Sequence, residues 1–360
     1  MALLTPLGRL NEIDIDCPNT QMRLLSMDKH RLLEGLVVEA LVEGILARLE
    51  AHGAMILPLS LVRAGRRDRQ IAWWLWAHRP AGEIDAVFDA LSARHPRAVV
   101  RCRYDQTRRD FLIERYPDLE DTSLQAFLTR LCRKRSLEFR HPDPDVCETL
   151  RTIRAFWRMT ECRVGIDMFH DIVLHRLYKN CALAPFLDWL WDIDTILQLP
   201  NGQRIQLEIK HKYPYQGRGG LCFGLNKGQV MTMLALADCG IDTFHVILVK
   251  PWWDRETGPG YLTQDHAHQD RVLLIGHYLD RGALKRLSRE ADGTSGRSES
   301  LYGRRAQSHK TIAAARFVVL GTLADSAETL ACNLLAGALR QPLPAVTDEL
   351  LQYHRCGPEE

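Results

Sequence analysis

A tight turn between two apolar segments is the feature that most constrains how this chain folds. Residues 191–212 read WDIDTILQLPNGQRIQLEIKHK, and Pro200, Asn201 and Gly202 separate two strand-like runs. Proline suits the first position of a turn, and glycine suits the left-handed position that closes a three-residue hairpin loop. Such a loop pairs Leu199 with Gln203. The segment therefore predicts a β-hairpin of defined register.

This register gathers charged side chains on one face of the hairpin. Counting back from the turn, Asp194 stands opposite Glu208, and Asp192 stands opposite Lys210. Directly opposed residues of an antiparallel pair have Cβ atoms roughly 4.5–5.5 Å apart. A two-residue loop would instead place Asp194 opposite Ile209 and divide the charges between two faces. The turn residues favour the first arrangement.

The gathered residue types suit a divalent cation. Two facing carboxylates repel each other unless a cation lies between them. Oxygen ligands without a neighbouring cysteine or histidine favour Mg²⁺ or Mn²⁺. Lys210 points to the same place and could orient a water or stabilise charge on a phosphate. A salt-bridge group on an amphipathic hairpin is the alternative, because the D-x(n)-E-x-K pattern is short and common.

The segments around the hairpin predict an α/β module. We expect a helix over residues 164–180, strands over 189–199 and 203–212, a helix over 226–239 and a buried strand over 243–250. An order of helix, strand, strand, helix and strand is typical of a mixed α/β fold. The helix and buried strand that follow the hairpin strengthen the interpretation of the hairpin as a functional site.

Residues 162–250 resemble the PD-(D/E)XK (restriction-endonuclease-like) nuclease superfamily. WDIDTIL…IQLEIKHK is similar to its acidic-Ile-Asp strand followed by a strand that ends in E-x-K. The resemblance implies an αβββαβ core in which Asp194, Glu208 and the carbonyl of Ile209 hold Mg²⁺ or Mn²⁺. It further implies that Lys210 serves the attacking water.

The segment after the hairpin extends this resemblance. Many members carry a glutamine early in the next helix, and Gln229 in LNKGQ occupies that place. The loop followed by GQ is similar to the cleavage domain of type IIS restriction endonucleases. The resemblance implies that Gln229 supports the catalytic site, whereas the alternative is an ordinary polar residue in the first turn of a helix.

Two departures from the family pattern concern its first helix and first strand. The stretch CALAPFLDW leaves little room for a first core strand, and the helix over 164–180 lacks the glutamate that many members carry. Asp171 is the nearest candidate for this supporting acid, and Asp192 is a second candidate.

Basic residues flank the expected site and could contact phosphates of a nucleic acid. The candidates for this role are Lys212, Arg218 and Lys227.

The remaining chain is expected to form two flanking regions. Residues 1–145 would form an α+β domain for recognition or partner binding, 146–255 the nuclease core, and 256–360 a mainly helical region with a mobile basic loop over 291–310. In the flanking regions we expect helices over 28–52, 123–134, 146–159, 271–289 and 323–339, and strands over 55–62, 70–78, 84–88 and 98–104.

Three other motifs favour structural interpretations. Residues 82–85 (GEID) also read as an acidic-Ile-Asp strand, but Arg101 and Arg103 stand where E-x-K would be and cannot hold a cation. Trp73, Trp74 and Trp76 are interpreted as sheet packing rather than as a base-stacking surface. Residues 265–270 (DHAHQD) are interpreted as a polar loop, because no third ligand stands at a defined spacing.

Composition bounds the class of protein. Lys and Arg total 47 and Asp and Glu total 45, so the net charge is +2, yet basic residues gather over 63–69, 101–115, 130–140 and 297–310. Such clusters suit a polyanion, and the alternative is a set of solvated faces. Ten cysteines without a CxxC pair exclude a zinc ribbon and a disulfide framework. Without an export signal or a long apolar run, we expect a soluble cytoplasmic protein.

These observations predict an Mg²⁺-dependent nuclease. The expected reaction is phosphodiester hydrolysis by a DNA endonuclease, in restriction, anti-phage defence or DNA processing. The expected partner is nucleic acid, with a homo-oligomer or a partner protein bound through the N-terminal domain. The alternative is a catalytically inactive nuclease fold that acts as a nucleic-acid-binding or scaffold subunit.

Overall fold

The computed structural model describes residues 2–27, 32–66, 69–116, 121–133, 139, 151, 153–154, 157–158, 167–254, 257, 259–262, 266–300 and 303–357. The chain divides into two compact units. Unit 1 comprises Met1–Leu33, Pro58–Asp192 and Arg297–Arg305, and unit 2 comprises Glu34–Leu57, Ile193–Gly296 and Ala306–Glu360. This division differs from the three consecutive segments expected over 1–145, 146–255 and 256–360, because each of them contributes residues to both units.

Unit 1 is built on a six-stranded sheet with the strand order β8-β7-β6-β5-β4-β9. Most neighbouring strands are antiparallel, whereas β5 and β6 run parallel and are joined by the helix α3. The elements of unit 1 are β1 (Leu4–Thr5), β2 (Gly8–Arg9), α1 (Pro18–Leu25), β4 (Leu59–Arg66), β5 (Arg69–Ala77), α3 (Gly82–Arg94), β6 (Val99–Asp105), β7 (Asp110–Arg115), β8 (Thr122–Ser123), α4 (Leu124–Leu131), η3 (Met168–Val173), α6 (Leu174–Leu177), η4 (Tyr178–Leu183) and β9 (Trp189–Ile193).

The strand expected over 84–88 is wrong, because these residues lie in the helix α3. Ile84, Val87, Phe88 and Leu91 are its buried residues, and their spacing is that of one helix face. The acidic-Ile-Asp motif is too short to reveal the helical spacing of these apolar residues. Arg101 of β6 is buried and its guanidinium is paired with carboxylates, including Glu114 at 2.7 Å. Residues 82–85 therefore belong to a packed structural region and not to a second metal site.

The tryptophans of β5 are core residues. Trp73, Trp74 and Trp76 are all buried, and the Trp76 ring lies 5.1 Å from that of Phe111. This confirms their interpretation as sheet packing. Much of the basic cluster over 101–115 is likewise paired with acids inside unit 1, as for Arg103 with Asp121 at 2.6 Å. Most of residues 134–140 and the side chains of 297–306 lie outside the described part of the chain.

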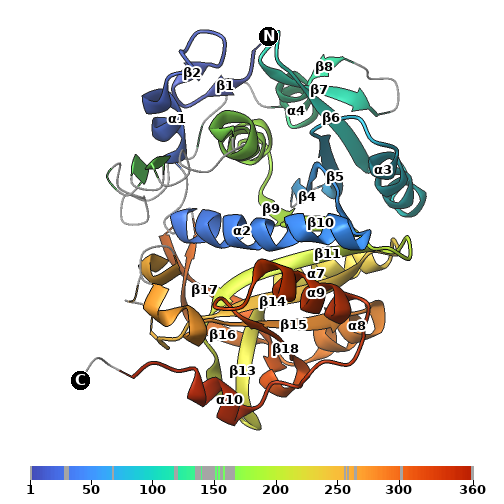
Figure 1. The fold of residues 1–360 in the computed structure, drawn as a ribbon. Helices are drawn as coiled ribbons and strands as arrows, with labels where there is room; N and C mark the ends of the chain where they lie inside the picture. Colours follow the sequence, from blue (N-terminus) through green and yellow to red (C-terminus); the bar gives the residue numbers. More distant parts are fainter. Residues whose placement is uncertain are drawn as a thin grey trace. The chain divides into compact units, whose positions relative to one another are not determined.

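Unit 2 contains a second six-stranded sheet, with the strand order β18-β15-β14-β11-β10-β3, and a four-stranded sheet, with the order β12-β13-β17-β16 (Figure 1). The elements of unit 2 are α2 (Leu32–Leu46), η1 (Ala47–His52), β3 (Met55–Ile56), β10 (Thr195–Gln198), β11 (Arg204–Lys212), β12 (Tyr215–Gly217), β13 (Gly220–Asn226), α7 (Lys227–Ala237), β14 (Asp242–Val249), η5 (Pro259–Leu262), η6 (His266–Arg271), β15 (Leu273–Leu279), α8 (Arg281–Arg289), β16 (Gly293–Ser300), β17 (Gly303–Ala313), η7 (Ala314–Arg316), β18 (Val318–Thr322), α9 (Ala327–Ala338) and α10 (Asp348–Tyr353).

Helices cover both faces of the larger sheet of unit 2. Ile247 of β14 packs in one apolar cluster with Val230 and Met233 of α7. Phe244, three residues earlier and therefore on the other face, lies against Gly337 of α9. Because both faces are covered, residues 205–209 of β11 and residues 243–249 of β14 are buried. A polar residue on these strands consequently needs hydrogen-bond partners inside the protein.

The register of the predicted hairpin is confirmed. Leu199 donates its N–H to the carbonyl of Gln203 at 2.8 Å, and Thr195 pairs with Leu207 in the ladder of β10 and β11. Gly202 has a φ of 80°, which is the left-handed conformation that the turn requires. The strand expected over 189–199, however, consists of two strands. They are β9 in unit 1 and β10 in unit 2, and Asp194 interrupts them.

Two further expectations for the C-terminal region are corrected. Residues 271–289 are not helical throughout, because Leu273–Leu279 form β15 and only Arg281–Arg289 form a helix. Residues 291–310 are not an isolated loop, because they contain β16 and much of β17. β17 pairs with β13, for example Leu225 with Lys310, and this distant partner could not be recognised from the local sequence. The fold is thus mixed α/β, but its C-terminal region is not mainly helical.

Among the described helices, none combines the length and apolar character needed to cross a lipid bilayer.

Candidate functional site

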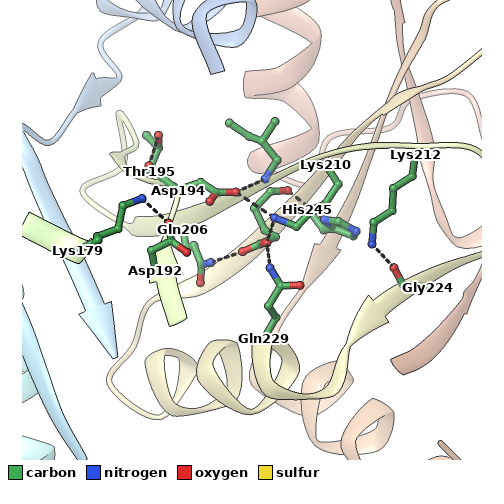
Figure 2. A network of polar contacts seen from close by, with 12 residues as sticks. Lys179, Asp192, Asp194, Thr195, Gln206, Lys210, Lys212, Gly224, Gln229 and His245 are labelled. Carbon is green, nitrogen blue, oxygen red and sulfur yellow. Dashed lines mark hydrogen bonds and ion pairs between the residues drawn. The ribbon is translucent and has the colours of Figure 1, made fainter. Parts of the chain in front are cut away.

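The candidate site lies where β10, β11 and α7 of unit 2 meet (Figure 2). Asp194 immediately precedes β10 and its carboxylate reaches across to β11. Its Oδ2 accepts the N–H of Ile209 at 2.8 Å and lies 3.4 Å from Nζ of Lys210. The Asp194 side chain keeps 15% of its surface exposed. The interruption of the strand therefore leaves this carboxylate accessible while two groups of β11 hold it in place.

Glu208 is the buried acid of the site. It lies in the middle of β11, and its side chain is only 1% exposed. Gln206 donates to its Oε2 at 3.0 Å, Gln229 donates to its Oε1 at 2.6 Å, and the Lys210 ammonium forms an ion pair with the same Oε1. Burial of a carboxylate is costly unless charge and hydrogen bonds compensate it. These three donors provide that compensation.

Lys210 connects the two acids. Strand alternation places it on the same face as Glu208, two residues earlier. Its ammonium contacts Glu208 and lies 3.4 Å from Asp194, and 21% of the side-chain surface is exposed. A single positive charge is thus shared by carboxylates from two neighbouring segments.

Gln229 reaches this site because α7 begins at the right place. The side chain of Asn226 caps the helix by accepting the N–H of Gly228 at 2.9 Å. Gln229 follows in the first turn, so its amide points toward β11 and Glu208. Its contact with a buried carboxylate favours the supporting role over that of an ordinary surface residue.

Two basic groups behind the site have lowered pKa values. Burial, opposed by the hydrogen bond with the Glu208 carbonyl and reinforced by Lys212 and Lys210, lowers the pKa of His245 to about 3. His245 is therefore neutral at pH 7, with Nδ1 3.0 Å from the Glu208 carbonyl. Burial and the nearby Lys210 ammonium lower the pKa of Lys212 to about 8.

The expected nucleic-acid contacts differ in their surroundings. Lys212 is half-buried and donates to the carbonyl of Gly224 at 2.6 Å. Lys227 is exposed at the start of α7 and pairs with Asp292 at 2.6 Å. Arg218 is exposed in the turn between β12 and β13. Their contact with a nucleic acid stays a prediction, as does the role of the Ile209 carbonyl as a metal ligand.

The two candidate supporting acids belong to unit 1. Asp192 lies in β9, and its carboxylate is 2.5 Å from Nζ of Lys179. The ladder of β10 and β11 begins at Thr195, so the predicted pairing of Asp192 with Lys210 is not part of it. Asp171 lies in η3 and accepts the N–H of Asp167 at 2.8 Å. Each acid is thus bound within unit 1.

Unit 2 instead provides an acid that sequence reasoning missed. Glu34 of α2 lies 2.7 Å from both Nδ1 of His211 and Nζ of Lys250, and Nε2 of His211 lies 2.5 Å from the hydroxyl of Tyr261. Burial raises the pKa of Glu34, but His211 and Lys250 outweigh this and lower it to about 2. No local signal could connect Glu34 with His211, which is 177 positions away. Gln206 was detectable, because it shares the face of Glu208.

Comparisons with protein-family models, with curated proteins and with solved structures each gave no match.

Proposed function

We propose that this protein is a metal-dependent nuclease that hydrolyses phosphodiester bonds, with the catalytic centre in unit 2. The observation that carries the proposal is the convergence of Asp194 and Glu208 on one ammonium, that of Lys210. A position that holds a cation between two carboxylates is suited to a divalent ion. A purely structural ion pair on a surface hairpin would not bury Glu208 or surround it with two glutamines.

The donor set fits Mg²⁺ or Mn²⁺. The candidate ligands are the carboxylates of Asp194 and Glu208, and the carbonyl of Ile209 is the third candidate. All are oxygen atoms, which hard divalent ions prefer. The neutral His245 is engaged with the Glu208 carbonyl through Nδ1. When bound, the ion would supply Lewis-acid stabilisation of the charge on the phosphate.

The residues of the chain have separate roles in this proposal. Lys210 keeps the attacking water in place by hydrogen bonding and balances the negative charge that grows on the phosphate. Gln229 and Gln206 fix the orientation of Glu208, and the N–H of Ile209 fixes Asp194. The water oxygen attacks phosphorus and gives up a proton to solvent, the bond from phosphorus to the leaving oxygen breaks, and the leaving oxygen takes up a proton from solvent.

The order of elements in unit 2 also supports the proposal. Within the larger sheet and its helices, the chain order is α2, β3, β10, β11, α7 and β14, and the strands β12 and β13 of the smaller sheet lie between β11 and α7. Without those two strands, the order is helix, three strands, helix and strand. This is the αβββαβ order that the family resemblance implies. In this proposal the helix and first strand come from residues 32–56 in place of a helix over 164–180 and a strand in 181–189, and residues 58–192 separate them from β10. DNA as the substrate, and restriction, anti-phage defence or DNA processing as the setting, follow from that resemblance.

The test is cleavage of supercoiled and linear DNA in Mg²⁺ and in EDTA. We expect cleavage in Mg²⁺ only, and losses of at least about 100-fold in the variants Asp194→Asn, Glu208→Gln and Lys210→Met. Lys285→Met, at an exposed position of α8, is the matched control and should retain activity. Thermal melting of each variant verifies that it is folded. Cleavage that survives EDTA or Asp194→Asn would overturn the proposal.

One result would favour the alternative function. If Mg²⁺ raises the melting temperature and DNA binds, but no substrate is cleaved, the fold serves a nucleic-acid-binding or scaffold subunit.

A further inference from the structure

A second cluster of metal-ligating side chains lies in unit 2 between η1 and α9. His52 ends η1, whereas Glu328 and Cys332 lie one turn apart on α9. Nε2 of His52 is 2.6 Å from Oε1 of Glu328 and 3.5 Å from Sγ of Cys332. All three donor atoms lie within 4.8 Å of one another. Two segments separated by about 280 residues in the sequence thus present nitrogen, oxygen and sulfur to one point.

The local structure holds these donors in place. Gly53, with a φ of 74°, ends η1 in the left-handed conformation and fixes the position of His52. Ser326 caps α9 by accepting the N–H of Thr329 at 3.1 Å. Glu328 and Cys332, four residues apart, share one face of α9. The three candidate ligands therefore lie in the helical segments η1 and α9 and not in a loop.

We propose that His52, Glu328 and Cys332 form a binding site for zinc or a similar borderline transition-metal ion. Zn²⁺ accepts imidazole nitrogen, thiolate and carboxylate ligands, and three protein ligands with a water are a common set. Mg²⁺ does not use a thiolate, so this site differs in metal class from that of Asp194 and Glu208.

Binding has a defined proton balance. The Cys332 thiol loses its proton when the thiolate becomes a ligand, and His52 binds through Nε2 with its proton on Nδ1. Glu328 and Cys332 are exposed, so an ion can enter from solvent. The bound ion would tie the end of η1 to α9.

The experiment uses the full-length protein freed of metal and titrated with Co²⁺, followed by Zn²⁺. We expect one equivalent of Co²⁺ to produce thiolate-to-metal charge-transfer absorption, which Zn²⁺ then removes. Cys332→Ser should abolish this band, and His52→Gln and Glu328→Gln should weaken Zn²⁺ binding by at least about tenfold. Cys239→Ser, which changes a partly buried cysteine two residues after α7, is the matched control and should behave like the unchanged protein.

A second measurement guards against variants that fail to fold. In the unchanged protein, Zn²⁺ should slow the reaction of Cys332 with a thiol reagent, and Glu328→Gln should remove this protection. Asp194→Asn should leave both signals intact, so failure of the nuclease proposal would not affect this one. A normal charge-transfer band in Cys332→Ser, or no saturable Zn²⁺ binding by the unchanged protein, would refute the site.

Discussion

Glu208 shows how much a single buried charge depends on its neighbours. Its carboxylate has almost no contact with solvent and relies on Lys210, Gln206 and Gln229. Leaving a buried polar group without its hydrogen-bond partner costs on the order of 1–3 kcal/mol, and more when the group is charged. The two glutamines therefore hold the Glu208 carboxylate in its orientation.

Replacing Gln229 should lower both activity and stability. In Gln229→Ala, Glu208 loses the donor at 2.6 Å and gains freedom to turn. We expect kcat for DNA cleavage to fall by about 10- to 100-fold, as for other groups that orient metal ligands, with a small change in KM. The control is Gln352→Ala at an exposed position of α10. Unchanged kcat in Gln229→Ala would show that the glutamine does not position Glu208.

The Glu34 carboxylate should make the stability of unit 2 depend on pH. Its pKa is about 2 in the folded protein and 4.5 in an unfolded reference, so the ionised form is favoured by folding. The stabilisation is present above pH 4.5 and is lost as pH falls toward 2. It amounts to on the order of 3 kcal/mol, or about 1.4 kcal/mol per pH unit in that window.

Urea unfolding of Glu34→Gln and of the unchanged protein measures this effect. The unchanged protein should be more stable at pH 7, and the difference should shrink between pH 4.5 and 3. Glu50→Gln, at an exposed position of η1, should show no such trend. A stability difference that stays constant over this range would contradict the assignment of a low pKa to Glu34.

At the scale of elements, the hairpin turn decides which face of β10 its residues occupy. β11 is held on its other side by eight paired positions with β14, so a change in the turn must be absorbed by β10. A shift of one residue moves every side chain of a strand to the opposite face. The spatial relation between Asp194 and Glu208 therefore depends on the length of a loop that contains neither.

Deleting Asn201 should destroy the site while leaving most of unit 2 folded. The remaining two-residue loop would move Asp194 away from Glu208, and we expect Mg²⁺-dependent cleavage to fall by at least about 100-fold. Gly202→Ala keeps the loop length but costs about 1 kcal/mol through its φ of 80°. That variant should melt earlier and still cleave DNA when folded. Equal activity of the two variants would contradict this account of the register.

At the scale of the whole molecule, unit 1 interrupts the sequence of unit 2. The larger sheet of unit 2 uses β3 from one side of the interruption and β10 from the other. The two strands are antiparallel, Ile56 pairs with Leu197, and Leu57 donates to the carbonyl of Ile196 at 2.9 Å. The ends of residues 58–192 are thus attached at neighbouring points, which is the geometry that tolerates a domain insertion.

A chain that starts at Leu32 and carries a short Gly/Ser linker in place of residues 58–192 should therefore yield a folded unit 2. The linker closes a hairpin between β3 and β10, so we expect one cooperative thermal transition whose midpoint rises with Mg²⁺. The same shortened chain with Glu208→Gln is the control and should lose the Mg²⁺ effect. A shortened chain that melts without cooperativity would show that unit 2 needs unit 1 to fold.

The sequence alone determined the hairpin, its register and the convergence of Asp194, Glu208 and Lys210, whereas the place of Gln229 was implied by the family resemblance. These features arise from a turn of three residues, the alternation of side chains along strands and the start of the next helix, all of which act over short distances. Only the tertiary structure decided what lies around that centre. It paired β3 with β10, which is more than 130 residues away in the sequence, paired Glu34 with Lys250, and bound Asp192 within unit 1. It also paired β17 with β13. Such contacts join residues that are far apart in the chain. They are stabilised by burial and by charge pairing, which cannot be predicted from a local sequence pattern.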